Sequence, residues 1–143
     1  MEIMELKFSK RLKEVVSISR EESVRLGQGY IGVEHLLLGL LKEGDGMAVS
    51  ILKKLGVTIE DVIFKLEGYI QPSTREIQPN NNIPLTRQAE RVLRKITALE
   101  ARIFHSDIVG TEHLLLAILR DTDSVATQVL EEFDINYKVI KMM

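Results

Sequence analysis

The chain has 143 residues, of which 45% are hydrophobic and 28% charged, so it can bury a core without metal or disulfide support. Its 19 basic and 21 acidic residues give a formal net charge of -2, which excludes a global positive field for nucleic acid or an anionic membrane. Cysteine is absent and the three histidines lack metal-ligand spacing, which excludes disulfides, thiolate catalysis and Cys-containing zinc sites. We therefore expect no nucleic-acid partner, no metal and no cofactor.

The N-terminal segment mixes acidic and basic residues, and no run in the sequence reaches the roughly 20 apolar residues that a membrane span needs. Together with the lack of cysteine, this favours a reducing, cytoplasmic location and no membrane partner. Tryptophan is absent and aromatic residues make up only 5% of the chain, which favours interlocking aliphatic helices. The composition is thus typical of an all-α fold.

The first half of the chain is predicted to form helices that follow one another closely. Apolar residues at steps of three and four predict a helix from about Ser9, its N-cap, to Leu26. Residues 34–42 are apolar almost all round, which predicts a short helix buried at the centre of the fold. Asp45 is the expected N-cap of a third helix, and a fourth is expected to end near Tyr69.

The second half of the chain repeats this plan after a connector. Residues 70–84 contain three prolines and a run of asparagines, which predicts an exposed linker. Beyond the linker, Thr86 is the expected N-cap of the first helix, and a central helix begins near Thr111. We therefore predict two pseudo-symmetric four-helix repeats, residues 1–69 and 85–143, packed into one eight-helix domain.

The two halves share one sequence signature. Residues 31–41 read IGVEHLLLGLL and residues 109–119 read VGTEHLLLAIL, an offset of 78 residues. In the helix that precedes this signature the offset is 77, where Arg11 corresponds to Gln88. The second copy therefore contains one extra residue. We place it within Arg94–Phe104, and we expect a bulge or a shift of register in that helix.

Two motifs suggest chemistry that their context excludes. Residues 27–32 match GxGxxG, but a helix precedes them instead of the strand that a dinucleotide site requires. The pairs Glu34-His35 and Glu112-His113 are adjacent on a helix, where side chains point about 100° apart and do not easily share a metal. We expect each histidine to make a local hydrogen bond. Neither glutamate has a second catalytic group, so an enzyme is not predicted.

The glutamates themselves allow two interpretations. Each stands near the start of a predicted helix, where a negative charge stabilises the helix by about 0.3 to 1 kcal/mol. The same helix start also leaves backbone N–H groups free to bind an anion. A carboxylate beside free N–H donors suits a ligand that carries a cation and an anion together, such as a guanidinium with a phosphate or carboxylate.

The paired segments IGVEHLLLGLLKEGDGMA and VGTEHLLLAILRDTDSVA resemble the repeated signature of Clp N-terminal domains, over nearly the whole chain. The resemblance is strongest to the domain of ClpC-type AAA+ unfoldases, which feed substrates to the ClpP protease. It implies a non-enzymatic docking domain for protein substrates and adaptor proteins, with the remainder of a Clp ATPase in cis and ClpP as an indirect partner. The alternative is a free-standing Clp-N protein that regulates such machines or binds other protein partners.

The resemblance also implies recognition of phosphorylated arginine at two equivalent sites. In each, a glutamate holds the guanidinium, while backbone amides and a hydroxyl hold the phosphate. Carried over by position, the first site consists of Ser9, Val33 and Glu34, and the second of Thr86, Thr111 and Glu112. Val33 stands where the family has threonine and has no hydroxyl to donate, so the second site keeps the fuller chemistry.

Overall fold

The computed structural model describes residues 7–71, 83–121 and 123–143. In the first half the helices are α1 (Lys10–Arg25), α2 (Val33–Glu43), α3 (Met47–Lys54) and α4 (Ile59–Tyr69). In the second half they are α5 (Arg87–Arg91), the π-helix η1 (Val92–Ile96), α6 (Thr97–Ile103), α7 (Thr111–Arg120), α8 (Val125–Glu132) and α9 (Tyr137–Lys141). Two short strands, β1 (Lys7–Phe8) and β2 (Ile108–Val109), precede α1 and α7.

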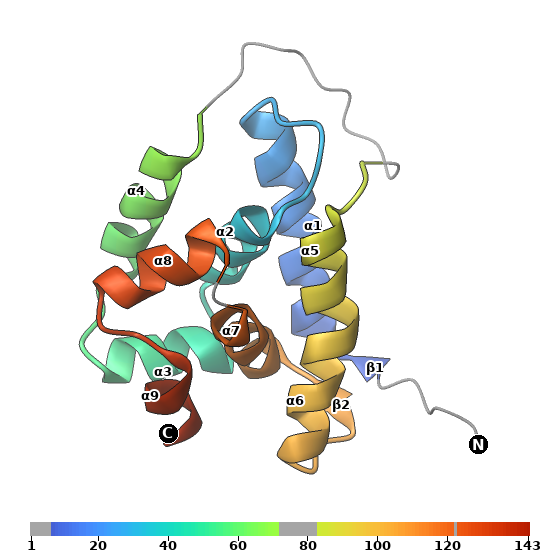
Figure 1. Cartoon of the computed structure of the whole chain (residues 1–143), viewed down its shortest axis with the longest axis vertical. Helices are drawn as coiled ribbons and strands as arrows, with labels where there is room; N and C mark the ends of the chain where they lie inside the picture. The colour runs from blue at the N-terminus through green and yellow to red at the C-terminus, as the bar shows by residue number, and fades with distance from the viewer. Residues whose placement is uncertain (1–6, 72–82, 122) are drawn as a thin grey trace.

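The helices follow the same plan in both halves (Figure 1). Because α5, η1 and α6 continue into one another as one helix, each half contributes four helices to the described residues, which confirms the predicted all-α fold. Residues 72–82 of the predicted 70–84 linker lie outside the described residues. The division into residues 1–69 and 85–143 stays a prediction.

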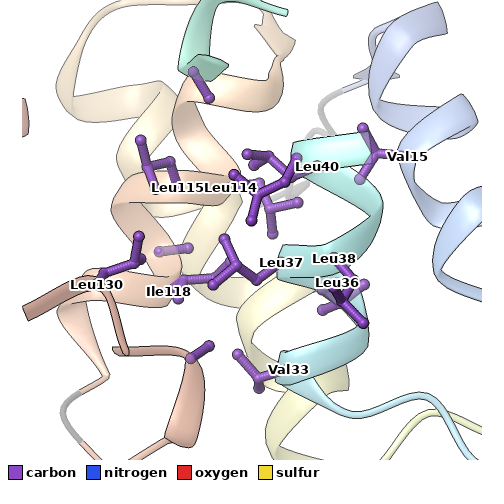
Figure 2. Close-up of a cluster of buried hydrophobic side chains, with 14 of the residues drawn as sticks. Val15, Val33, Leu36, Leu37, Leu38, Leu40, Leu114, Leu115, Ile118 and Leu130 are labelled. Carbon is purple, nitrogen blue, oxygen red and sulfur yellow. The ribbon is translucent and has the colours of Figure 1, made fainter. Parts of the chain in front are cut away.

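The core is built around α2 and α7, which lie at the centre of the molecule (Figure 1). From Val33 to Leu41, α2 buries every residue except Glu34, and from Thr111 to Leu119, α7 buries every residue except Glu112. Leu37 and Leu40 of α2 point toward Leu114 and Ile118 of α7 across the interior (Figure 2). The burial of α2 and α7 confirms the predicted central position of these helices. Each buried leucine contributes about 1.5 to 3 kcal/mol to stability.

Each repeat covers the apolar surface of the other. In the packing, α2 contacts α7 and α8, while α3 lies against α7 and α4 against α8. The leucines of α2 and α7 are therefore hidden by helices from both halves of the chain. None of the helices in the described part of the chain is long and apolar enough to cross a bilayer.

Helix α1 crosses α2 at very close range, and Gly39 makes this possible. A Cβ atom at Gly39 would lie 2.5 Å from the carbonyl oxygen of Val15 and would overlap the hydroxyl of Ser19. At the equivalent position of α7, 78 residues later, the chain has Ala117, which is also fully buried. The second copy therefore accommodates a methyl group where the first copy requires glycine.

The π-helix η1 absorbs the extra residue of the second copy. Ser9 and Thr86 are equivalent N-caps at an offset of 77, whereas Ser19 and Thr97 are equivalent at an offset of 78. Ser19 and Thr97 each donate a hydroxyl hydrogen bond to the carbonyl four residues back, at 2.8 and 2.5 Å. The extra residue thus falls before Thr97. The predicted bulge is confirmed. It overlaps only the start of the predicted range Arg94–Phe104 and begins two residues earlier, at Val92.

The N-caps of three helices agree with two predictions and correct a third. Ser9 and Thr86 accept hydrogen bonds from backbone N–H groups at 3.0 Å, as expected for N-caps. The N-cap of α3 is Gly46, however, and not Asp45. Since glycine has no side chain, the hydroxyl oxygen of Thr111 accepts the N–H of Ala48 at 3.2 Å instead. The cap of α3 therefore comes from the other repeat.

A buried ion pair joins the first and second helices of each repeat. Glu100, which is fully buried, binds Arg120 Nε at 2.6 Å and accepts a hydrogen bond from the Tyr137 hydroxyl at 2.7 Å. At the equivalent position in the first repeat, Glu22 binds Lys42 Nζ at 2.6 Å and also pairs with Arg25. Neither carboxylate stood out in the sequence, because Lys42 and Arg120 lie 20 residues away from them on the next helix.

We predict that Arg120→Ala lowers the free energy of unfolding by about 3 kcal/mol, because it leaves the carboxylate of Glu100 buried without a cation. Lys42→Ala is the matched control and is expected to lower it by only about 1 kcal/mol, since Glu22 keeps Arg25 as a partner. Urea denaturation measures both values. Equal losses of unfolding free energy in the two variants would contradict this difference between the two carboxylates.

Candidate functional site

The two short strands bring together the starts of two helices from opposite repeats. Strand β1 pairs in parallel with β2, with Phe8 opposite Val109. The N–H of Ser9 then donates to the carbonyl oxygen of Val109 at 2.8 Å. Because each strand leads directly into a helix, the N-termini of α1 and α7 lie side by side. Ser9 is thereby placed beside Gly110, the N-cap of α7.

A second, shorter pairing repeats this arrangement for α2 and α5. Ile31 forms a parallel bridge with Leu85. The N–H of Ile31 donates to Pro84 O at 2.8 Å, and the N–H of Thr86 donates to Ile31 O at 2.9 Å. Thr86, the N-cap of α5, therefore lies beside the turn that leads into α2.

These pairings correct the predicted grouping of the site residues, because each hydroxyl residue joins the glutamate of the other copy. At one end of α1, Arg11 pairs with Glu43 at the end of α2 at 2.9 Å. At the other end, the hydroxyl of Ser23 donates to Tyr30 O just before α2. Helices α1 and α2 thus run in opposite directions, and Ser9 lies far from the start of α2.

The structure therefore defines two crossed sites. The first, called the α7 site here, consists of Ser9, Arg11, Gly110, Thr111 and Glu112. The second, called the α2 site, consists of Gly32, Val33, Glu34 and Thr86. The sequence repeat shows which residues are equivalent, but it does not show which of the two hydroxyl residues lies beside which glutamate. Only the strand pairing determines the grouping.

The α7 site is an open cavity of about 280 Å³. Its lining residues come from the starts of α1 and α7, from α3 and from the loop before β2: Ser9, Arg11, Met47, Ser106, Ile108, Gly110, Thr111 and Glu112. The first N–H groups of a helix have no acceptor within that helix, and their positive partial charge favours an anion. Two helix starts and Arg11, whose guanidinium pairs with Glu43, thus line this cavity.

Each glutamate folds back over the glycine that precedes its helix. A Cβ atom at Gly110 would overlap the carboxylate of Glu112, and one at Gly32 would overlap that of Glu34. Both carboxylates are partly exposed, and among the described residues no cation pairs with either of them. The glycines therefore leave room for an acceptor that is open to an external cation.

The histidine after each glutamate makes the local hydrogen bond that the sequence predicts. Nδ1 of His113 accepts the N–H of Gly110 at 2.8 Å, and Nδ1 of His35 accepts the N–H of Gly32 at 2.9 Å. Burial lowers the pKa of both imidazoles below the ordinary 6.5, although the adjacent glutamates oppose this shift. Both rings thus favour the neutral form and serve to fix the glycine turn.

The pKa shifts predict that the domain loses stability in mild acid. Because both histidines bind protons more weakly when folded, the free energy of unfolding should fall as the pH drops below about 6.5. Urea denaturation at pH 7.5, 6.5 and 5.5 measures this. His105→Asn, which changes an exposed histidine, should keep the pH dependence, whereas His113→Gln should weaken it. A constant free energy across this range in the unmodified protein would contradict the prediction.

The α2 site has weaker chemistry for an anion. Val33 occupies the position of Thr111 and is buried, with no hydroxyl to donate. Gln88 occupies the position of Arg11 and carries no charge; its amide donates to Asp121 Oδ2 at 3.2 Å and to Asp123 O at 3.3 Å, much as Arg11 pairs with Glu43. The α2 site therefore keeps its glutamate but lacks a cationic residue at the position of Arg11.

A third feature is a groove between α1 and η1, which the sequence analysis did not find. Its cavity of about 350 Å³ has apolar walls that include Phe8, Val16, Leu85 and Leu93. Lys13, Arg20 and Arg94 also line it, and within the described chain the buried Nε of Arg20 has no hydrogen-bond partner. Lys13 and Arg20 come from α1 and Arg94 from η1, far away in the sequence, so no local motif marks the three together.

No three histidine, aspartate or glutamate side chains within residues 7–71, 83–121 and 123–143 come together in a way that could hold a metal ion.

Comparison with known proteins identifies the fold. The family model of the Clp repeat (R) N-terminal domain matches residues 7–133. The chain belongs to this family. Domains of the Clp repeat family have no catalytic role of their own, which agrees with the expectation from the sequence that the chain is not an enzyme.

Two relatives show which proteins carry such a domain. The chain is 40% identical over 138 residues to a "Probable ATP-dependent Clp protease ATP-binding subunit" of Chlamydia pneumoniae, with 94% of this chain and 16% of that protein covered. It is 37% identical over 130 residues to the chaperone protein ClpB of Oceanobacillus iheyensis, with 91% and 16% covered. The Clp repeat domain thus spans about a sixth of these relatives, which include more than one type of Clp ATPase.

Solved structures share the fold at low sequence identity. The N-terminal domain of the chaperone ClpD from Arabidopsis thaliana superposes with a TM-score of 0.72 at 19% identity, over 95% of this chain and 90% of that one. A ClpV N-domain, solved as a complex with a VipB peptide, superposes with a TM-score of 0.70 at 13% identity, over 99% and 91%. These neighbours confirm the arrangement of two packed helical repeats.

Proposed function

We propose that this Clp repeat domain docks protein substrates and adaptor proteins for a ClpC-type ATP-dependent unfoldase in the cytoplasm, and that its α7 site binds phosphoarginine. The observation that carries the proposal is the carboxylate of Glu112, which has no cation partner within the described part of the chain and lies beside two helix N-termini and Arg11. A ligand with one cationic and one anionic group matches this arrangement of charges.

The two charged parts of phosphoarginine fit different walls of the cavity. The guanidinium would pair with Glu112, whose carboxylate is a natural partner for a planar cation with several donors. The phosphate would lie against the N–H groups at the starts of α1 and α7, near Arg11 and the hydroxyls of Ser9 and Thr111. In the α2 site, Glu34 and Thr86 would offer a weaker version, because Val33 supplies no hydroxyl donor.

The groove between α1 and η1 supports docking of a longer segment in the same function. Its apolar walls and its cations Lys13, Arg20 and Arg94 would suit a peptide with apolar and acidic side chains from an adaptor or substrate. The ClpV N-domain, which shares the fold, was solved with a bound peptide. The much greater length of the relatives favours a domain joined in cis to a Clp ATPase, with ClpP as an indirect partner, over a free-standing protein.

Calorimetric titration of free phosphoarginine tests the proposal. We expect saturable binding by the unmodified domain and a loss of about 10- to 100-fold in affinity at the α7 site in Glu112→Ala. This corresponds to roughly 1.5 to 3 kcal/mol for a hydrogen bond to a charged group.

Glu34→Ala is the matched control, because it removes the equivalent carboxylate from the α2 site and should leave the tighter binding intact. Unphosphorylated arginine should bind more weakly than phosphoarginine if the anion is recognised. The absence of binding to the unmodified domain at millimolar ligand would exclude phosphoarginine, as would equal affinity of the Glu112→Ala variant.

A further inference from the structure

A larger cavity adjoins the α7 site. It has a volume of about 450 Å³, and its walls come from α3, α7, α9 and the end of α6. It shares Met47, Ser106 and Glu112 with the cavity of the α7 site, so the two cavities are neighbours. Glu112 belongs to the lining of both.

The larger cavity is mostly apolar. Its apolar lining includes Met47, Ile51, Phe104, Leu116, Ile140 and Met142. Met47 is 58% exposed and Phe104 41% exposed, so their apolar surfaces are open to a ligand. Flexible methionine side chains adapt to apolar groups of different shape. Apolar surface gathered in a hollow beside a charged site is characteristic of a pocket for one part of a larger ligand.

The charges at the rim indicate how such a ligand would lie. Glu112 is the acidic group shared by the two cavities, and Lys141, which lines the larger one, has its Nζ 5.9 Å from the centre of the Tyr137 ring. A cationic side chain of a ligand that pairs with Glu112 would therefore lie next to the apolar surface of the larger cavity. In an extended chain, residues two apart point to the same side, so two adjoining cavities suit side chains at this spacing.

We infer that the larger cavity is a specificity pocket, and that it receives an apolar side chain two positions from the phosphoarginine in a substrate chain. This inference rests on the proposed function, because phosphoarginine anchors the chain at Glu112. The α7 site then recognises a short motif of a phosphorylated arginine and an apolar residue.

Three synthetic peptides test the inference by calorimetry: Gly-Gly-pArg-Gly-Gly, Leu-Gly-pArg-Gly-Gly and Gly-Gly-pArg-Gly-Leu, where pArg is phosphoarginine. At least one leucine peptide should bind about tenfold more tightly than the glycine peptide, because burial of a leucine side chain is worth at least this much. A peptide with leucine directly beside pArg should show no such gain.

Phe104→Ser should remove the preference for leucine, because Phe104 lines only the larger cavity. Ile103→Ser is the matched control, since Ile103 is 42% exposed but lines neither cavity, and it should keep the preference. The inference would be overturned if the leucine and glycine peptides bound with equal affinity, or if the Phe104→Ser variant kept the preference for leucine. Either result would leave the proposed binding of phosphoarginine intact. Failure of free phosphoarginine and all peptides to bind would overturn the proposed function as well.

Discussion

The parallel pairing of β1 with β2 decides where every group of the α7 site lies. One hydrogen bond, from the N–H of Ser9 to Val109 O, fixes the start of α1 beside the start of α7. Two helix N-termini with the same partial charge are thereby held together, although they repel each other and favour an anion between them. The repeats are thus joined at the place where the polar chemistry is concentrated, while their leucines pack deeper in the molecule.

The repeats have diverged in ways that depend on one another. Thr111 both lines the α7 site and caps α3, whose own N-cap is Gly46. The equivalent of α3 in the second repeat, α8, is capped by its own Ser124, and the residue of the first repeat at the position of Thr111 is the buried Val33. In the α7 site, the hydroxyl of the residue before the glutamate therefore caps a helix of the other repeat. In the α2 site no hydroxyl is needed at this position, because α8 has its own cap. This difference favours the α7 site as the stronger ligand site.

Much of the fold could be predicted from the sequence, because helical periodicity and caps are local properties. The central helices and the caps at Ser9 and Thr86 follow from side chains within a few residues. The grouping of the site residues could not be predicted, because two equivalent copies allow two pairings and only the strands distinguish them. Asp45 had the right chemistry for a cap, but Thr111, from a distant part of the chain, provides it.

The most direct test of the crossed arrangement is an NMR titration of the ¹⁵N-labelled domain with phosphoarginine, followed through the amide chemical shifts. The structure predicts that the largest changes at the tighter site fall together on Ser9 to Leu12 and on Gly110 to His113, at the starts of α1 and α7. Changes at Gly110 to His113 accompanied by Thr86 and Arg87, with Ser9 unaffected, would contradict it.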